Sequence, residues 1–188
     1  VAIYFAGGYL LPSQVEMVVW RTVAAPHDRM SALVATPKSW RVWSVWSPLS
    51  RRVARDVFGV PEIGAGGSWL IAGTKGSLQM TLTSFEPAVR ASYDLIIDPL
   101  PVPLRGAIDF YNRGRTTKVR WQLSGDVGDQ LALRWLGLIA PALTKGYFQD
   151  AIGRLGELAV ELEHEAKQDA LAAEEAVLLG EPKPSEQR

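Results

Sequence analysis

The 188-residue sequence contains no cysteine and only two histidines, His27 and His164. The lack of cysteine excludes disulfides, thiolate nucleophiles and zinc sites that need sulfur, and two histidines so far apart do not make a metal-binding cluster. We therefore expect no metal and no cofactor. Charge of one sign is not in excess either, because 20 basic side chains balance 20 acidic ones. Overall charge thus gives no indication of a nucleic-acid partner.

Long apolar runs are also missing. The one candidate, residues 1–11 (VAIYFAGGYLL), ends at Pro12 and has about half of the roughly 20 residues that a membrane-spanning helix needs. We expect residues 1–12 to be a separate apolar segment, either the end of a membrane anchor or a strand or loop packed on the body. Two locations follow from these alternatives: the cytoplasm, or a membrane to which a soluble domain is tethered.

The balanced charge conceals a division along the chain. Residues 1–156 carry a net charge of +6, and residues 157–188 carry a net charge of −6. We expect a folded domain over residues 13–165 and an acidic tail over residues 166–188, which begins as a helix and loses order in its proline-containing end. A tail that rests on the basic body is the alternative.

Hydrophobic periodicity divides the chain into a strand with two short helices, a block of strands and a final helical region. Residues 15–23 are rich in β-branched side chains and predict a strand, whereas residues 26–35 have the spacing of a helix that begins at a proline. Trp40, Trp43 and Trp46 recur every three residues, which suits one face of a second short helix. Such an aromatic stripe is typical of a core or of the rim of a cavity.

Six further segments have the alternation of an antiparallel sheet with one buried face. In the clearest of them, Val119, Trp121 and Leu123 alternate with polar neighbours. Helical spacing returns after residue 128, and we expect Pro141 to cause a kink or a separate short helix before a long one. This order predicts an α+β fold in which the long helix covers one face of the sheet. The six segments are residues 51–60, 68–73, 77–85, 90–98, 106–112 and 116–124, with a hairpin turn at 112–115.

Four packing signatures follow one another along residues 15–163. They are Val23-Ala24-Ala25-Pro26 after the first strand, Thr36-Pro37-Lys38-Ser39-Trp40 with Trp43-Ser44, Gly64-Ala65-Gly66-Gly67-Ser68-Trp69 before a strand, and Arg134-Trp135, Gly137-Leu138, Phe148, Ile152 and Leu155 in the last helix. In this order they resemble the START-like helix-grip superfamily and, within it, the SRPBCC polyketide cyclase/dehydrase families. Three departures stand out: Val45 replaces a proline of the family's Trp-Ser-Pro-Trp stretch, Arg21 occupies an inward strand position, and Pro141 interrupts the last helix.

The resemblance implies a helix grip: a curved antiparallel sheet wrapped around a long carboxy-terminal α-helix, with two short helices between the first two strands. Such a grip leaves an apolar cavity, the usual setting for a small-molecule site. We expect it to bind a hydrophobic ligand such as a lipid, a quinone or a polyketide-like molecule; the alternative is that the same side chains fill a closed core. The expected ligand-binding residues are Trp43, Trp69, Ile71, Met80, Tyr93, Leu95, Phe110, Trp121, Phe148 and Arg21, the last as a partner for a carboxylate of the ligand or of the protein.

Catalytic arrangements do not stand out. No Gly-x-Ser-x-Gly elbow accompanies a serine, the glycine-rich segment 64–67 lacks the lysine of a phosphate loop, and Asp94, Asp98 and Asp109 are expected to face water. We expect no catalytic residue and favour a binder or carrier. Two alternatives remain: a cyclase- or dehydratase-like enzyme using Arg21 or Tyr93, and an interaction or stress-response module whose cavity is filled.

The expected partner is therefore a hydrophobic small molecule, with membrane association through residues 1–12. Arg113, Arg115, Lys118 and Arg120 form a basic group in the sequence. We see no exposed aromatic side chains interleaved with them and no nucleic-acid motif, so we expect no nucleic-acid partner. The oligomeric state stays open at this point.

Overall fold

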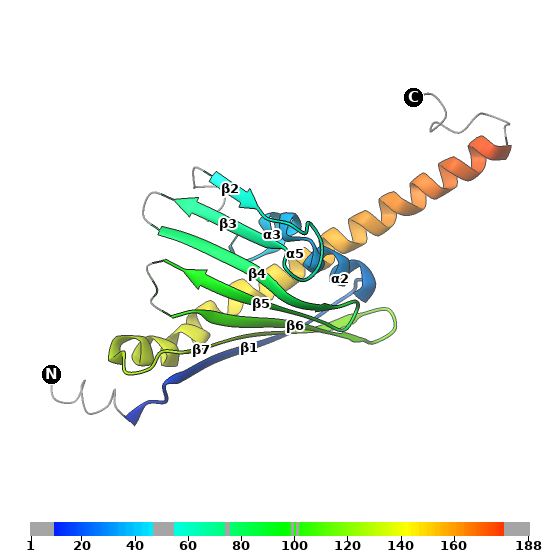
Figure 1. Cartoon of the computed structure of the whole chain (residues 1–188). Coiled ribbons are helices and arrows are strands. Elements are labelled where there is room, and N and C mark those ends of the chain that lie inside the picture. The colour runs from blue at the N-terminus through cyan, green and yellow to red at the C-terminus, as the bar shows by residue number, and fades with distance from the viewer. Residues whose placement is uncertain (1–9, 47–54, 74–75, 99, 101, 179–188) are drawn as a thin grey trace.

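The computed structural model describes residues 10–46, 55–73, 76–98, 100 and 102–178. These residues form a seven-stranded antiparallel sheet with a long final helix packed on it and two short helices after the first strand (Figure 1). The predicted α+β helix-grip fold is thereby confirmed. In chain order the elements are β1 (Gln14–Val23), α2 (His27–Ala35), α3 (Pro37–Trp43), β2 (Arg55–Phe58), β3 (Ser68–Gly73), β4 (Gly76–Glu86), β5 (Arg90–Ile97), β6 (Leu104–Asn112), β7 (Thr117–Asp126) and α5 (Leu131–Leu178).

The sheet has the order β1-β7-β6-β5-β4-β3-β2, so β2 to β7 form a meander and β1 pairs with β7 at the far edge. In the β1–β7 register Val19 lies opposite Trp121, and Trp20 lies opposite Arg120. Val19 and Trp121 are fully buried under the helices, whereas Trp20 is partly exposed on the outer face. This alternation is the one that the sequence pattern predicts.

The hairpin between β6 and β7 is also where the sequence places it. Gly114 has a φ of 75°, a left-handed conformation that glycine adopts without a steric penalty. The Asn112 side chain supports the turn, because its Oδ1 accepts a hydrogen bond of 2.8 Å from the Gly114 N–H. The local turn chemistry thus sets the register of the two strands.

The long helix α5 crosses the sheet and lies close to β1. A Cβ atom added at Gly137 would lie 2.0 Å from Cγ1 of Val15, and one added at Gly156 would lie 3.1 Å from Cβ of Val23. Both glycines therefore permit an approach that any larger residue would obstruct. The helix continues through Pro141, so the separate short helix that we considered before it is not formed.

Beyond Ala159 the helix leaves the body and projects past the sheet with mostly exposed side chains (Figure 1). The boundary predicted at residues 165–166 stays a prediction, and the predicted loss of order at the end of the tail falls on residues 179–188, outside the described residues. The same holds for residues 1–9 of the predicted apolar segment. Within the part of the chain that the structure describes, no helix is long and apolar enough to cross a membrane.

Candidate functional site

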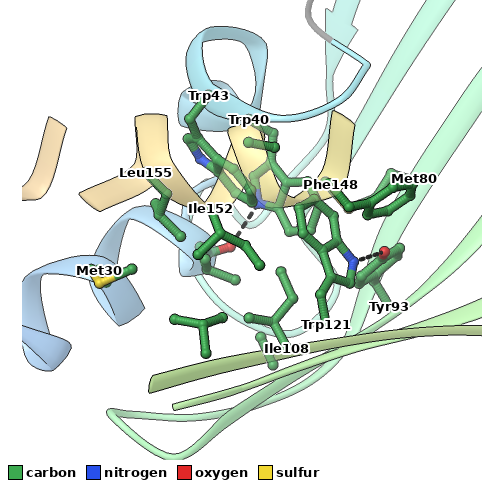
Figure 2. Packing of buried hydrophobic residues seen from close by; sticks show 14 of the residues in the cluster. Met30, Trp40, Trp43, Met80, Tyr93, Ile108, Trp121, Phe148, Ile152 and Leu155 are labelled. Atoms are coloured by element: carbon green, nitrogen blue, oxygen red, sulfur yellow. Dashed lines mark hydrogen bonds between the residues drawn. The ribbon is translucent and has the colours of Figure 1, made fainter. Parts of the chain in front are cut away.

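The centre of the grip is filled by aromatic side chains. Trp40 and Trp43 of α3 meet Trp121 of β7, with ring centroids 6.1 Å and 5.6 Å from it, and Phe148 of α5 lies 4.8 Å away on another side. Figure 2 shows these rings gathered between α3, α5 and the sheet. All four side chains are buried, so the middle of the molecule is a packed core.

Two indole N–H groups in this core have partners inside the protein. Trp40 Nε1 donates a 2.8 Å hydrogen bond to the carbonyl oxygen of Val34, and Trp121 Nε1 donates a 2.7 Å bond to the hydroxyl oxygen of Tyr93 (Figure 2). Burial raises the pKa of the Tyr93 hydroxyl well above its usual value near 10, because a phenolate there would lose its hydration; the hydrogen bond from Trp121 acts in the opposite direction. Tyr93 is therefore a neutral structural group at physiological pH.

A cavity lies at one end of the grip, beside this packed centre. Its volume is about 390 Å³, which is within the range of small-molecule sites. It is bounded by the starts of β1 and β6, the end of β7, the segment after α3 and the first part of α5. The residues that line it are Val15, Glu16, Met17, Val45, Trp46, Leu100, Val102, Leu104, Leu123, Ser124, Val127, Leu133, Leu136, Gly137, Ala140, Pro141, Thr144, Tyr147 and Phe148.

The inward face of α5 contributes mostly small side chains to the wall of the cavity. At the spacing of one helix face, Leu133 is followed by Gly137, Ala140 and Thr144, and all four residues line the cavity. The same face continues as Phe148, Ile152 and Leu155 in the next segment of the helix, where it is buried in the core. The stripe thus changes from small to large side chains, and space remains where they are small.

Two residues of the cavity wall, Trp46 and Thr144, carry polar side-chain atoms whose hydrogen bonds are informative. The indole Nε1 of Trp46 is buried and has no hydrogen-bond partner among the described residues. Thr144 Oγ1 donates to the carbonyl oxygen of Ala140 at 2.7 Å and lies 3.2 Å from the Met17 sulfur. A buried donor without an acceptor is costly, so this N–H is an uncompensated group in the wall beside the cavity.

The segment that carries Trp46 is held in place from α5. Arg154 Nε donates to the carbonyl oxygen of Trp43 at 3.2 Å, and its Nη2 donates to that of Ser44 at 3.3 Å. The Ser44 hydroxyl accepts a bond from the Trp46 backbone N–H. These contacts fix the chain where Val45 and Trp46 enter the wall of the cavity. Val45, one of the departures from the family pattern, is thus a lining residue.

The predicted ligand-binding residues fall into three groups. Phe148 lies between the packed centre and the cavity and lines the latter. Arg21 lies elsewhere on the helix face of the sheet and lines a second hollow. The remaining predicted residues belong to the core cluster and do not line the cavity; they are Trp43, Trp69, Ile71, Met80, Tyr93, Leu95, Phe110 and Trp121.

The lining residues of the cavity that we did not predict come mainly from the first part of α5 and from the start of β1. A signal for them exists in the sequence, since small residues replace large ones at the inward positions 137, 140 and 144. A second sequence signal that this helix segment is unusual is the apolar character of its outward positions. Strand parity alone could not find the site, because it distinguishes inward from outward residues and not filled space from empty space.

Arg21 is paired within the protein. Its Nη1 donates a 2.6 Å hydrogen bond to the carbonyl oxygen of Gln149 and lies 3.6 Å from Oδ1 of Asp150. Its guanidinium also occupies the space beside Gly153, where a Cβ atom would lie 2.9 Å from Cζ. The open hollow around it, of about 660 Å³, includes Glu157 in its lining. Of the two partners considered for Arg21, the structure supplies an acidic side chain of the protein.

One expectation about carboxylates is wrong. Asp109 points to the outer face of the sheet as its strand position predicts, but it is buried and does not face water. Its two oxygens accept bonds from Arg90 at 3.0 Å and from Arg120 at 3.4 Å, and these side chains cover it. The pair of cations compensates the buried charge. Among the described residues, no group of three or more acidic or histidine side chains could hold a metal ion.

The expectation that no exposed aromatic side chains interleave with the basic group is also wrong. Trp20 and Tyr111 are both partly exposed there, with ring centroids 5.7 Å apart. The Lys118 ammonium lies 4.4 Å from the centroid of the Trp20 ring, and the Arg120 guanidinium lies 5.8 Å from it. These cation–π contacts occupy a ring that a base would need for stacking. The absence of a nucleic-acid partner stays a prediction.

Comparison with known proteins gives one family. A family model described as polyketide cyclase / dehydrase and lipid transport matches residues 14–160, which covers the sheet, both short helices and α5 up to the point where it leaves the body. No curated protein matches the sequence.

Several solved structures share the fold. Protein CV1439 from Chromobacterium violaceum is 15% identical, with a TM-score of 0.55 and coverage of 77% of this chain and 97% of that one. Protein MLL2253 from Mesorhizobium loti is 17% identical, with a TM-score of 0.55 and coverage of 78% and 97%. A point mutant of norcoclaurine synthase from Thalictrum flavum, in complex with a transition-state analogue, is 12% identical, with a TM-score of 0.59 and coverage of 80% and 96%. At these identities the likeness concerns the fold.

Proposed function

This chain belongs to the polyketide cyclase/dehydrase and lipid transport family, and we propose that it binds and carries a hydrophobic small molecule in the cavity at the first half of α5. The observation that carries the proposal is the cavity itself, an apolar space of about 390 Å³ beside a packed core. Burial of apolar ligand surface there contributes roughly 25 cal/mol per Å². The family description includes lipid transport, which is consistent with such a ligand.

The chemistry of the lining favours a ligand that is apolar over most of its surface and carries a hydrogen-bond acceptor. The Trp46 N–H supplies the one buried donor without a partner among the described side chains, so a carbonyl, ester or ether oxygen of the ligand would satisfy it. Medium-length acyl compounds and small ring systems with a ketone have this pattern. The volume of this cavity is at the low end of the usual range for ligand pockets. Larger ligands such as intact sterols would need more space.

A carrier is favoured over an enzyme by the ionisable groups around the cavity. Glu16 and Tyr147 are the ionisable side chains among its described lining residues, and both are exposed to solvent. Tyr93 and Arg21, the two candidates for proton transfer, lie outside the lining. General acid–base chemistry requires a group within hydrogen-bond reach of the reacting atoms. The cavity provides a site for holding a molecule rather than for moving protons.

The proposal is tested by closing the cavity from the helix side. The substitution Ala140→Trp should place a large ring in it and obstruct it, and we expect the affinity for the neutral fluorescent probe N-phenyl-1-naphthylamine to fall about tenfold or more. Ala142→Trp is the matched control, because Ala142 lies two residues away, is exposed and does not line the cavity. Unchanged probe affinity in Ala140→Trp, with the fold intact by circular dichroism, would contradict the proposal. Native mass spectrometry of freshly purified protein would identify a co-purified ligand.

A further inference from the structure

The outward face of the first half of α5 is unusually apolar for a helix in contact with water. Five large side chains on this segment are between 46% and 69% exposed; they are Leu136, Leu138, Ile139, Leu143 and Tyr147. A helix on the surface of a soluble protein normally places polar residues on its solvent side. Clustered exposed apolar side chains of this size mark an interaction surface.

Charge distinguishes this segment from the rest of the helix. Residues 131–149 contain no carboxylate, and their two charged side chains, Arg134 and Lys145, are basic. Arg134 is engaged at the helix start, where it bonds the carbonyl oxygen of Gly128 at 2.7 Å and Asp129 at 3.2 Å. The acidic side chains of α5 begin at Asp150, beyond the apolar face. A surface without carboxylates suits an interface in which buried negative charge would be expensive.

The apolar face adjoins both the cavity and the amino-terminal apolar run. Leu136 and Tyr147 belong to the face and also line the cavity, so the two are continuous. Arg134 Nη1 donates a 3.2 Å hydrogen bond to the carbonyl oxygen of Leu11, the last residue of the run VAIYFAGGYLL. Figure 1 shows the start of β1 and the start of α5 at the same end of the sheet. The apolar run therefore ends beside the apolar face.

We propose that this face is a membrane-docking surface, which lies on a lipid bilayer with Leu138, Ile139 and Leu143 inserted at the interface. A bilayer accepts a convex apolar helix without a complementary groove, as interfacial helices do. Docking itself is independent of the ligand, but the role that we assign to it, the passage of an apolar ligand between bilayer and cavity, rests on the proposed function.

Three residues of the face allow a test that leaves the cavity intact, because Leu138, Ile139 and Leu143 do not line it. We expect wild-type protein to float with phosphatidylcholine vesicles, with or without phosphatidylglycerol. The variant Leu138→Gln/Ile139→Gln/Leu143→Gln should bind them about tenfold more weakly or worse, with unchanged affinity for N-phenyl-1-naphthylamine in solution. The matched control changes three exposed apolar residues elsewhere, Val60→Gln/Ile63→Gln/Ile96→Gln, and should bind vesicles as the wild type does.

Wild-type protein that stays free of vesicles would overturn the proposal. So would vesicle binding that survives the triple variant and is lost only when Phe5→Gln is introduced into the amino-terminal run. A wild-type dimer that the triple variant converts to a monomer would also overturn it, because it would identify the face as an interface between two copies. The Ala140→Trp variant separates this proposal from the preceding one. It should still float with vesicles although it no longer binds the probe. Vesicle binding by a wild-type protein that fails to bind the probe would overturn the proposed function and leave the docking surface standing.

Discussion

Two consecutive segments of α5, residues 131–147 and 148–159, both pack against β1 but lie in different environments. From Phe148 to Ala159 the inward stripe consists of side chains that are buried in the aromatic centre. From Leu133 to Thr144 the inward side chains are mostly small and the large ones point outward. Residues 148–159 therefore stabilise the fold. Residues 131–147 are less tightly packed and border the cavity and the apolar surface. One helix thus serves structure and binding in separate segments.

The comparison implies that equal substitutions will have unequal costs in the two regions. Leu95 is fully buried in the packed centre, whereas Leu123 is partly buried in the wall of the cavity. We expect Leu95→Ala to lower the free energy of unfolding by about 2–5 kcal/mol, because it leaves a new cavity in a close-packed core. Leu123→Ala should cost about 1–2 kcal/mol, since its neighbours already border empty space. Urea unfolding monitored by tryptophan fluorescence measures both.

For the affinity of a ligand, Leu123→Ala should have the larger effect and Leu95→Ala the smaller one. Leu123→Ala changes the wall that a ligand contacts and should alter probe affinity, whereas Leu95→Ala should leave it unchanged in the folded protein. Equal stability losses for the two variants would show that the cavity is filled or collapsed in solution. The distinction between a filled and a hollow region would then fail.

Much of the fold could be predicted from the sequence, because local periodicity and turn chemistry determine it. The alternation in β7, the turn at Gly114 and the inward positions of Phe148 and Ile152 are all where the pattern predicts them. The site was harder, since eight of its expected contacts lie in the core cluster. A buried position follows from parity, but whether its surroundings are filled depends on side-chain volumes from several elements together. Trp121, for example, meets rings from α3 and α5 that lie far from it in the chain.

The Tyr93–Trp121 hydrogen bond allows a second test of the packed centre. Tyr93→Phe removes the acceptor of the buried Trp121 N–H, and we expect a loss of about 1–3 kcal/mol in the free energy of unfolding. The pH dependence should change as well. Burial raises the pKa of Tyr93 in the folded state, so above pH 10 the phenol ionises in the unfolded chain but not in the folded one. The free energy of unfolding of the wild type should therefore be independent of Tyr93 ionisation below pH 10 and should fall as the pH rises above that value.

Urea unfolding at pH 8 and at a series of values above pH 10 measures this slope. One such group accounts for up to about 1.4 kcal/mol per pH unit, so Tyr93→Phe should be less sensitive to alkali than the wild type by that amount. Leu95→Ala is the control, because it removes a buried side chain that cannot ionise; it should lower stability and leave the alkaline slope unchanged. An identical alkaline slope in wild type and Tyr93→Phe would mean that the centre admits water, contrary to the packing described.

The smallest expected effect concerns Trp46 in the wall of the cavity. Trp46→Phe keeps an aromatic ring there but removes the N–H that has no partner among the described residues. Competition against N-phenyl-1-naphthylamine should show about three- to tenfold weaker binding of decan-2-one, whose carbonyl can only accept a hydrogen bond, and unchanged binding of a saturated hydrocarbon of the same length. Trp20→Phe, on the outer face, should change neither affinity. An equal loss for ketone and hydrocarbon would assign to Trp46 a packing role alone, and the hollow half of the grip would then select its ligand by shape without help from a polar contact.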